Sequence, residues 1–411
     1  MKFSLILSSF NYGGIEILFL KLAKILSKES QVDVYILSKK VDKNLYEELG
    51  QYANIFTVKD FLSFNLPFDS VGINALIPWK PSFIKKIEKT ENIHLADTNC
   101  LICWLNILNK KLSIKNISLG AYHSEELVWQ SKWYFREVEK DAIKAFGSKN
   151  ILVTNNASKL KLIKEYGKSM NSVRMMPAGV EINDNFQKRK YKNLKNKLVC
   201  ISRLVNYKEY ILRVADSIDS VIKKFPDFEF HIYGDGPERK RFQEYTKGKK
   251  IFFHKGIEIS EFKNAVQDAK IFIGSGTSLI YASALSVPSM IGIESAKTTE
   301  TYGFFCETKG LDYQEQNQSY ELKNISDVIL ETLSMSEDDF QEVALKCYDR
   351  SKDFCITKTI EAIKSSQNMN FENQLKLGFL KKAKYIYSFF TWSLLNKLGI
   401  IQSKKDRHHL K

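Results

Sequence analysis

Short apolar, β-branched runs alternate along the chain with longer stretches in which apolar residues recur every three or four positions. The runs predict strands, and the longer stretches predict amphipathic helices. In the first half, strands are expected at residues 3–9, 32–38, 71–77, 92–97, 116–122 and 150–155, with helices such as 15–29 and 134–147 between them. Continuous apolar strands separated by helices predict a parallel sheet covered on both faces.

The pattern restarts after a polar segment rich in Lys and Asn. Further strands are expected at 198–202, 228–234, 251–254, 269–274 and 288–293. We therefore expect two doubly wound, Rossmann-like α/β domains at 1–180 and 198–340, a linker at 181–197, a helical stretch at 341–370 that crosses back to the first domain, and a tail at 371–411. Such sheets bind ligands at the carboxyl ends of their strands.

Composition narrows the class of partner. The 411 residues include 62 Lys and Arg against 47 Asp and Glu, a net charge of +15, which favours phosphates, phospholipid head groups or nucleic acid. Six cysteines without a repeated spacing indicate reduced thiols, and the one close pair, Cys100 and Cys103, lacks the second half of a zinc site. The N-terminus predicts a first strand instead of a signal peptide, and no apolar run reaches about eighteen residues.

Paired glycines follow the first predicted strand, where Gly13 and Gly14 precede a helix. Such a turn lets the backbone approach a ligand, and the free N–H groups of the new helix favour an anion or a hydroxyl. A tight strand-to-helix turn without a ligand explains the pair equally well. The spacing is not that of a dinucleotide-binding fingerprint.

Two cations lie on the loop after the strand at 198–202. A guanidinium at Arg203 and an ammonium at Lys208 can together neutralise a nucleoside diphosphate, although solvated surface cations are the simpler interpretation. The segment 271–290 then runs strand, small-residue loop, helix. Its hydroxyls and successive N–H groups at 275–278 form a potential anion cradle.

The set "GGIE", "SRLVNYKEY", "YGDGPER" and "GSGTSLIYASALSVPS" resembles the family 4 glycosyltransferases, two-domain GT-B enzymes that transfer a sugar from a nucleotide-activated donor. The resemblance is densest from about 197 to 295. It implies a retaining reaction and a central cleft between the domains. It also implies roles for residues at matching positions: His123, Arg203 and Lys208 as catalytic residues, and Gly13, Gly14, Gly234, Gly276, Thr277, Ser278 and Tyr281 as donor-binding residues.

The sequence departs from that family at one point. The family has two glutamates separated by seven residues, and Ile273 and Tyr281 occupy those positions here. A tyrosine hydroxyl can still bind a ribose; alternatively, activity is weak or lost and the chain serves a partner enzyme. We find no D-x-D triplet, so no metal ion and no cofactor are expected besides the donor substrate.

The tail combines lysines with aromatic residues. From Phe371 to Lys411 nine Lys or Arg face two acidic residues, a net charge of +7. Residues 376–405 are predicted to contact an anionic membrane surface, since the uncharged run at 385–396 is too short to span a bilayer but long enough to lie in its interface. The alternative is that Phe389, Phe390, Trp392 and Leu395 pack onto the first domain. Nucleic acid is not expected, because the basic residues interleave with a large apolar face.

Together these features and the resemblance predict a cytoplasmic, membrane-associated glycosyltransferase. The resemblance implies a role in bacterial surface polysaccharide synthesis (capsule, O-antigen or lipopolysaccharide). Its partners would be a nucleotide-sugar donor and a glycan or lipid-linked acceptor. Three alternatives remain open: a non-catalytic GT-B subunit, a sugar-nucleotide epimerase, and a membrane-docked scaffold.

Overall fold

The computed structural model describes residues 1–11, 13–107, 116–122, 126–128, 133–182, 185–366, 378–398 and 400. The chain forms two compact units, each with its own core. Unit 1 comprises residues 1–177 and 356–411, and unit 2 comprises residues 178–355. The predicted linker at 181–197 lies in unit 2.

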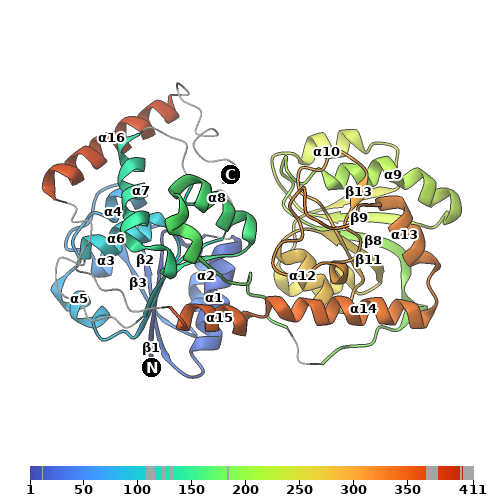
Figure 1. Ribbon diagram of the computed structural model, residues 1–411, viewed down its shortest axis with the longest axis horizontal. Helices are drawn as coiled ribbons and strands as arrows, with labels where there is room; N and C mark the ends of the chain where they lie inside the picture. The colour runs from blue at the N-terminus through green and yellow to red at the C-terminus, as the bar shows by residue number, and fades with distance from the viewer. Residues whose placement is uncertain are drawn as a thin grey trace. The chain divides into compact units, whose positions relative to one another are not determined.

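Unit 1 is built on a parallel sheet of seven strands, in the order β3-β2-β1-β4-β5-β6-β7. The strands are β1 (Lys2–Leu7), β2 (Gln31–Ile36), β3 (Asn54–Thr57), β4 (Asn92–Leu95), β5 (Asn116–Ala121), β6 (Ile151–Val153) and β7 (Arg174–Met175). β1 is buried from Phe3 to Leu7 because helices cover both faces of the sheet (Figure 1). The strand order reverses between β1 and β4, which places a switch point there.

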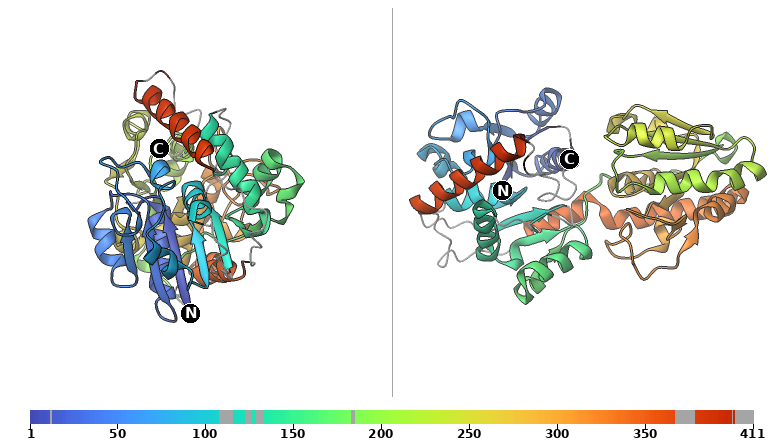
Figure 2. Two further views of the ribbon diagram at one scale, coloured as in Figure 1. Left: turned by 90° about the vertical axis from the view of Figure 1, so that its left-hand side faces the viewer. Right: turned by 90° about the horizontal axis from the view of Figure 1, so that it is seen from above.

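Ten α-helices of unit 1 are described. They are α1 (Gly14–Leu26), α2 (Lys43–Leu49), α3 (Val58–Phe61), α4 (Val71–Asn74), α5 (Pro81–Ile87), α6 (Thr98–Ile107), α7 (Tyr134–Phe146), α8 (Asn156–Tyr166), α15 (Ile356–Lys364) and α16 (Phe379–Lys397). α15 returns the chain to unit 1 and buries Ile356, Ile360 and Ile363 in its core. α16 lies along the outside of the unit beside α7 (Figure 2).

Unit 2 has a parallel sheet of five strands in the order β10-β9-β8-β11-β12, and its order reverses between β8 and β11. The strands are β8 (Lys195–Ile201), β9 (Glu229–Tyr233), β10 (Ile251–His254), β11 (Ala269–Gly274) and β12 (Ser289–Ile291), and a small antiparallel pair adds β13 (Glu300–Thr301) and β14 (Lys323–Asn324). The helices described are α9 (Tyr210–Lys224), α10 (Arg239–Tyr245), α11 (Phe262–Val266), α12 (Thr277–Ala284), α13 (Ile325–Ser334) and α14 (Glu337–Ser351).

The fold class expected from the sequence is confirmed in its main feature, two α/β units with parallel sheets. One predicted strand is wrong: residues 71–77 contain the helix α4, which the sequence around it does not distinguish from a short buried strand. β3 was not predicted. The helical stretch expected at 341–370 is divided between two units, since α14 belongs to unit 2 and α15 to unit 1.

Candidate functional site

The switch point of unit 2 brings together two loops that carry predicted site residues. β8 and β11 are adjacent strands, so the loop 202–209 after β8 and the loop 275–276 after β11 leave the same edge of the sheet. The first loop is held by the hydrogen bonds Leu204 N to Asp235 O (2.9 Å) and Lys208 N to Val205 O (3.0 Å). This edge of the sheet carries Arg203, Lys208 and the N-terminus of α12.

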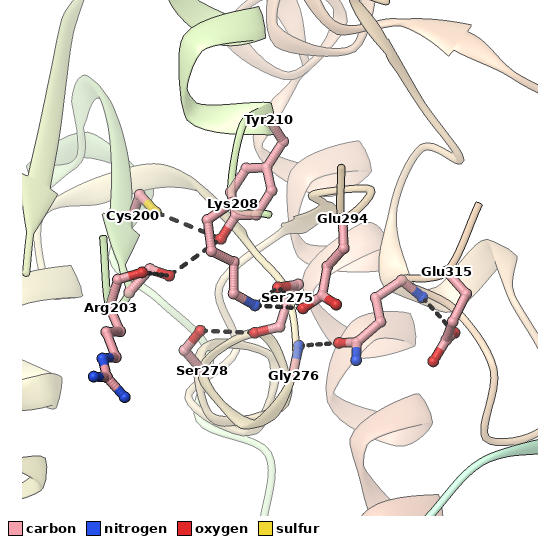
Figure 3. A network of polar contacts seen from close by, with 11 residues as sticks. Cys200, Arg203, Lys208, Tyr210, Ser275, Gly276, Ser278, Glu294 and Glu315 are labelled. Atoms are coloured by element: carbon pink, nitrogen blue, oxygen red, sulfur yellow. Dashed lines mark hydrogen bonds and ion pairs between the residues drawn. The ribbon is translucent and has the colours of Figure 1, made fainter. Parts of the chain in front are cut away.

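Lys208 is buried and already has partners (Figure 3). Its ammonium donates to the Ser275 hydroxyl and lies 2.5 Å from Glu294 Oε1. The Ser275 hydroxyl in turn donates to the same carboxylate oxygen over 3.0 Å. The cation is thus held in a fixed position, with its charge balanced by a carboxylate from the segment after β12.

Arg203 differs from Lys208 in both burial and partners. Its side chain is exposed and extends away from the Lys208 network (Figure 3). Within the described residues, its guanidinium makes no hydrogen bond or ion pair. It is therefore a solvent-facing cation at the carboxyl end of β8, able to bind an anionic group.

The N-terminus of α12 presents backbone donors to the same region. Gly276 is the N-cap with φ +65° and ψ −149°, a conformation that favours glycine over residues with a side chain. Its N–H donates to the side-chain oxygen of Gln314. The Ser278 hydroxyl donates to Ser275 O over 3.2 Å, and Thr277 is exposed. The Gln314 side chain thus accepts the hydrogen bond of the Gly276 N–H, a group that the sequence predicts to bind a phosphate.

Gly234 has a structural requirement for glycine. A Cβ atom at this position would stand 1.9 Å from the backbone oxygen of Ser202. The absent side chain lets the ends of β8 and β9 approach each other beside the Arg203 loop. Gly234 therefore shapes the loop of the site, whether or not it contacts a ligand.

Neither of the two positions where the resembling family has glutamates carries a carboxylate here. Ile273 is fully buried within β11. Tyr281 lies on α12, and its ring centroid is 5.8 Å from that of Phe262. The carboxylate that does approach Lys208 is that of Glu294.

Sequence inspection missed Glu294, Gln314 and Glu315. Glu294 could have been found, because it directly follows the predicted strand at 288–293, and parallel sheets bind ligands in such loops. Gln314 and Glu315 follow no strand of the main sheet. The backbone hydrogen bond from Glu294 N to Gln314 O (2.8 Å) joins the two segments. Burial raises the pKa of Glu315 to about 7.

In unit 1, the predicted glycines follow β1 at the switch point of that sheet. Gly13 is the N-cap of α1 in an extended conformation, and Gly14 opens the helix with free space where a side chain would begin. Nearby, the Asp97 carboxylate after β4 accepts hydrogen bonds from Ser8 Oγ (2.7 Å) and Asn99 N (2.8 Å). His123 lies outside the described residues.

A buried network joins β4, β5 and the residue that follows β5. His94 Nδ1 lies 2.8 Å from Ser118 Oγ, and its Nε2 lies 2.5 Å from the hydroxyl of Tyr122. Burial lowers the pKa of His94 to about 3, so the imidazole is neutral and serves as a structural hydrogen-bonding group. Among the described residues, no cluster of three or more His, Cys, Asp or Glu is arranged to hold a metal ion.

No protein-family model matches the sequence, and no curated protein is similar to it by sequence. Solved structures are similar in fold. HepE from Anabaena, in complex with UDP and glucose, has a TM-score of 0.58 and 13% identity over 88% of this chain and 98% of its own. TarM from S. aureus, in complex with fondaparinux, α-GlcNAc-glycerol and UDP, has a TM-score of 0.58 and 12% identity over 89% and 100%.

A third similar structure is a glycosyltransferase from Rickettsia africae, with a TM-score of 0.57 and 14% identity over 89% of this chain and 100% of its own. At such low identities the likeness concerns the fold. It extends over nearly the whole length of the compared proteins, so both α/β units take part. The fold of the chain is therefore that of the GT-B proteins.

Proposed function

We propose that this chain is a glycosyltransferase that transfers a sugar from a nucleoside-diphosphate donor to a hydroxyl of a glycan or lipid-linked acceptor. The observation that carries the proposal is the set of donors at one switch point: the Lys208 ammonium, the Arg203 guanidinium and the first amides of α12. Cations and backbone N–H groups on neighbouring loops are what a leaving diphosphate requires.

The similar structures support the choice of donor. HepE is also known in complex with UDP-glucose, with a TM-score of 0.59, and TarM was crystallised with UDP and a GlcNAc-bearing glycerol. We infer a similar nucleotide-sugar for this chain. The retaining stereochemistry, membership of family 4 and the setting in surface polysaccharide synthesis are parts of the proposal that follow from the sequence resemblance. The proposed location at the inner face of the membrane follows from the lysines and aromatic residues of the tail.

In the proposed mechanism, the diphosphate takes the places that protein oxygens hold in the structure. The Gly276 amide would exchange the Gln314 oxygen for a phosphate oxygen, and Lys208 would share its charge between Glu294 and the diphosphate. Arg203 would turn to the second phosphate from its exposed position. These groups stabilise the negative charge that develops as the glycosidic bond breaks. His123 and the Gly13-Gly14 loop are proposed to position the sugar and the acceptor.

A second candidate is a non-catalytic GT-B subunit. The observation that favours it is the absence of a carboxylate at positions 273 and 281. Such a subunit would bind the nucleotide but would not turn over a donor by itself. Turnover therefore separates the two proposals.

The test measures UDP affinity by calorimetry, and sugar transfer and donor hydrolysis with UDP-, GDP- and ADP-sugars. Arg203→Ala is the cleanest variant, because this side chain is exposed and makes no contact on which the fold depends within the described residues. It is expected to weaken UDP binding by roughly ten- to hundredfold, the loss of a charge-assisted hydrogen bond. Lys208→Ala should weaken it at least as much.

The matched control is Lys223→Ala, an exposed lysine at the other end of α9, about 22 Å of helix away from the Lys208 loop. It should bind UDP as the wild type does. UDP binding and turnover that are unchanged by both Arg203→Ala and Lys208→Ala would refute the assignment of the site. Binding without turnover of any donor would favour the non-catalytic subunit.

A further inference from the structure

α16 packs on unit 1 mainly through one face. Tyr385, Ser388 and Trp392 are buried. The ring of Phe135 on α7 lies with its centroid 6.0 Å from that of Tyr385 and 5.5 Å from that of Trp392. The side-chain oxygen of Ser388 accepts from Phe135 N over 3.4 Å. The tail therefore does pack onto the first domain, through this inner face. That packing determines which side of the helix points outward.

The opposite face is apolar and mostly exposed, although the Phe390 ring at its edge lies with its centroid 5.9 Å from that of Phe68. Its residues recur every three or four positions and form one stripe, here called the outer stripe: Leu380, Ala383, Tyr387, Phe390, Leu394 and Leu398. The exposed fractions are 74% for Leu380, 76% for Tyr387, 58% for Leu394 and 63% for Leu398. A row of large apolar side chains in water marks an interaction surface.

The charges on α16 itself all have one sign. Lys381, Lys384 and Lys397 are exposed on α16, and the sequence from 373 to 405 contains no Asp or Glu. Pairing this face with the same face of a second copy would bring lysines together without a counter-ion. An anionic bilayer surface offers acyl chains to the stripe and negative head groups to the lysines. None of the described helices is both long and apolar enough to cross a bilayer.

A cavity opens beside the outer stripe, between α16 and the start of α7. Its volume is about 470 Å³. The lining is largely apolar and consists of Trp133, Tyr134, Ala383, Lys384, Tyr387, Ser388 and Thr391. Ala383 and Tyr387 belong to both the cavity and the stripe. The Lys384 ammonium lies 6.0 Å from the centroid of the Tyr134 ring.

We propose that α16 is an interfacial membrane anchor: the outer stripe inserts among the lipid chains of an anionic bilayer, Lys381, Lys384 and Lys397 contact the head groups, and the cavity receives one hydrocarbon chain. The tail prediction covered residues 376–405 as a whole; the structure assigns the contact to one face and adds a site for a lipid chain. This inference does not depend on the nucleotide-sugar chemistry.

The main test is co-sedimentation of the full chain with vesicles of phosphatidylcholine alone or with 30% phosphatidylglycerol. The stripe variant carries Leu380→Ser, Tyr387→Ser and Leu394→Ser. All three side chains are exposed, so the fold is expected to persist, which thermal melting checks. The matched control changes three exposed apolar residues outside α16: Leu160→Ser, Phe252→Ser and Leu345→Ser.

The wild type and the control should bind the anionic vesicles at least tenfold more tightly than the stripe variant does, and 0.5 M salt should weaken the binding. Equal binding by the stripe variant, or no preference for anionic vesicles, overturns the proposal. Dimerisation that the stripe variant abolishes, together with no vesicle binding, would also overturn it and assign the face to a second copy.

The cavity is tested separately by Ala383→Trp, which fills it while keeping the outer stripe apolar. Weaker vesicle binding than the wild type supports a lipid chain in the cavity. Binding that is equal or stronger shows that the stripe alone is used and refutes that part of the proposal.

Discussion

The Lys208 ammonium has a carboxylate partner in Glu294, so the proposed diphosphate would have to compete with Glu294 for its charge. The pair is mostly buried, with side-chain exposures of 11% for Lys208 and 21% for Glu294. In such an environment a charge left alone is costly, which explains why both groups are retained together. Glu294 therefore sets the position of the cation and at the same time limits the affinity for anions.

Glu294→Gln is expected to tighten UDP binding. The substitution removes a negative charge near the proposed diphosphate site but keeps an oxygen that can accept from Lys208 and Ser275. A gain of about fivefold, or about 1 kcal/mol, is reasonable for partly screened charges at this distance. Calorimetric titration with UDP measures it. Asp219→Asn, which removes an exposed carboxylate on α9, serves as the control, and an unchanged or lower affinity of Glu294→Gln for UDP would contradict the competition.

Glu315 should make the stability of unit 2 depend on pH. Burial raises its pKa from 4.5 to about 7 in the folded state. The folded chain then binds this proton more tightly than the unfolded chain does. Its contribution to stability is complete below pH 4.5 and is lost as the pH rises to 7, by up to about 3 kcal/mol.

Glu315→Gln has no group that titrates at this position. Its stability relative to that of the wild type should therefore increase as the pH rises. Thermal melting at pH 4.5 and pH 7.5 is the measurement. The melting temperature of Glu315→Gln relative to the wild type should be higher at pH 7.5 than at pH 4.5. A difference that stays constant between the two pH values would show that the carboxyl is not perturbed by burial.

At the residue scale, the sequence predicted which loops carry the site residues better than it predicted which side chains contact one another. Arg203, Lys208 and Gly276 could be placed at strand ends because each follows a clear apolar run. The contact between Lys208 and Glu294 joins residues 86 positions apart. Local periodicity contains no information about such a pair, since it arises from the order of the strands in the sheet.

At the scale of elements, the close approach of β8 and β9 requires a residue without a side chain. Gly234→Ala would place its Cβ against the Ser202 backbone oxygen, which cannot move away as the end of a flexible side chain could. We expect a loss of about 2 kcal/mol in the free energy of unfolding. Gly14→Ala is the control, because a Cβ atom there meets no atom within 4 Å, and its effect should stay within about 0.5 kcal/mol.

Denaturant unfolding followed by circular dichroism compares the two variants. Equal stability of Gly234→Ala and the wild type would mean that the loop after β8 shifts without cost. In that case the loop carrying Arg203 is more adaptable than the structure indicates.

The elements that were predicted correctly are those whose sequence pattern matches their burial. The predicted strands at 3–9 and 198–202 are mostly apolar, and the structure buries residues 3–7 in β1 and 198–200 in β8. The segment 71–77 is also mostly apolar, but its first four residues form a helical turn, α4, packed against α6 and α16. A buried helical turn and a buried strand have the same composition over seven residues. Periodicity therefore could not separate them.

At the scale of the whole molecule, unit 2 is an insertion between two parts of unit 1. The chain enters unit 2 at Ala178 and leaves it at Cys355. Its two ends lie side by side, since Val180 N donates to Phe354 O over 2.9 Å and Val180 pairs with Cys355 as an isolated bridge. The sequence showed that the α/β pattern restarts, but the return of the chain through α15 depends on which core accepts Ile356, Ile360 and Ile363.

The insertion predicts that residues 178–355 fold alone. All the side chains of this core lie between Val180 and Phe354, and the paired ends need no support from unit 1 to stay together. The excised fragment should melt cooperatively by circular dichroism, whereas the fragment 1–177 should not, because it lacks the three buried isoleucines of α15.

If the diphosphate site is complete at the switch point of unit 2, the excised fragment should bind UDP within about threefold of the full chain. Arg203→Ala should weaken the binding equally in both. Calorimetry on the two proteins measures this. A folded fragment that fails to bind UDP, when the full chain binds it, would mean that groups of unit 1 are required for the nucleotide itself.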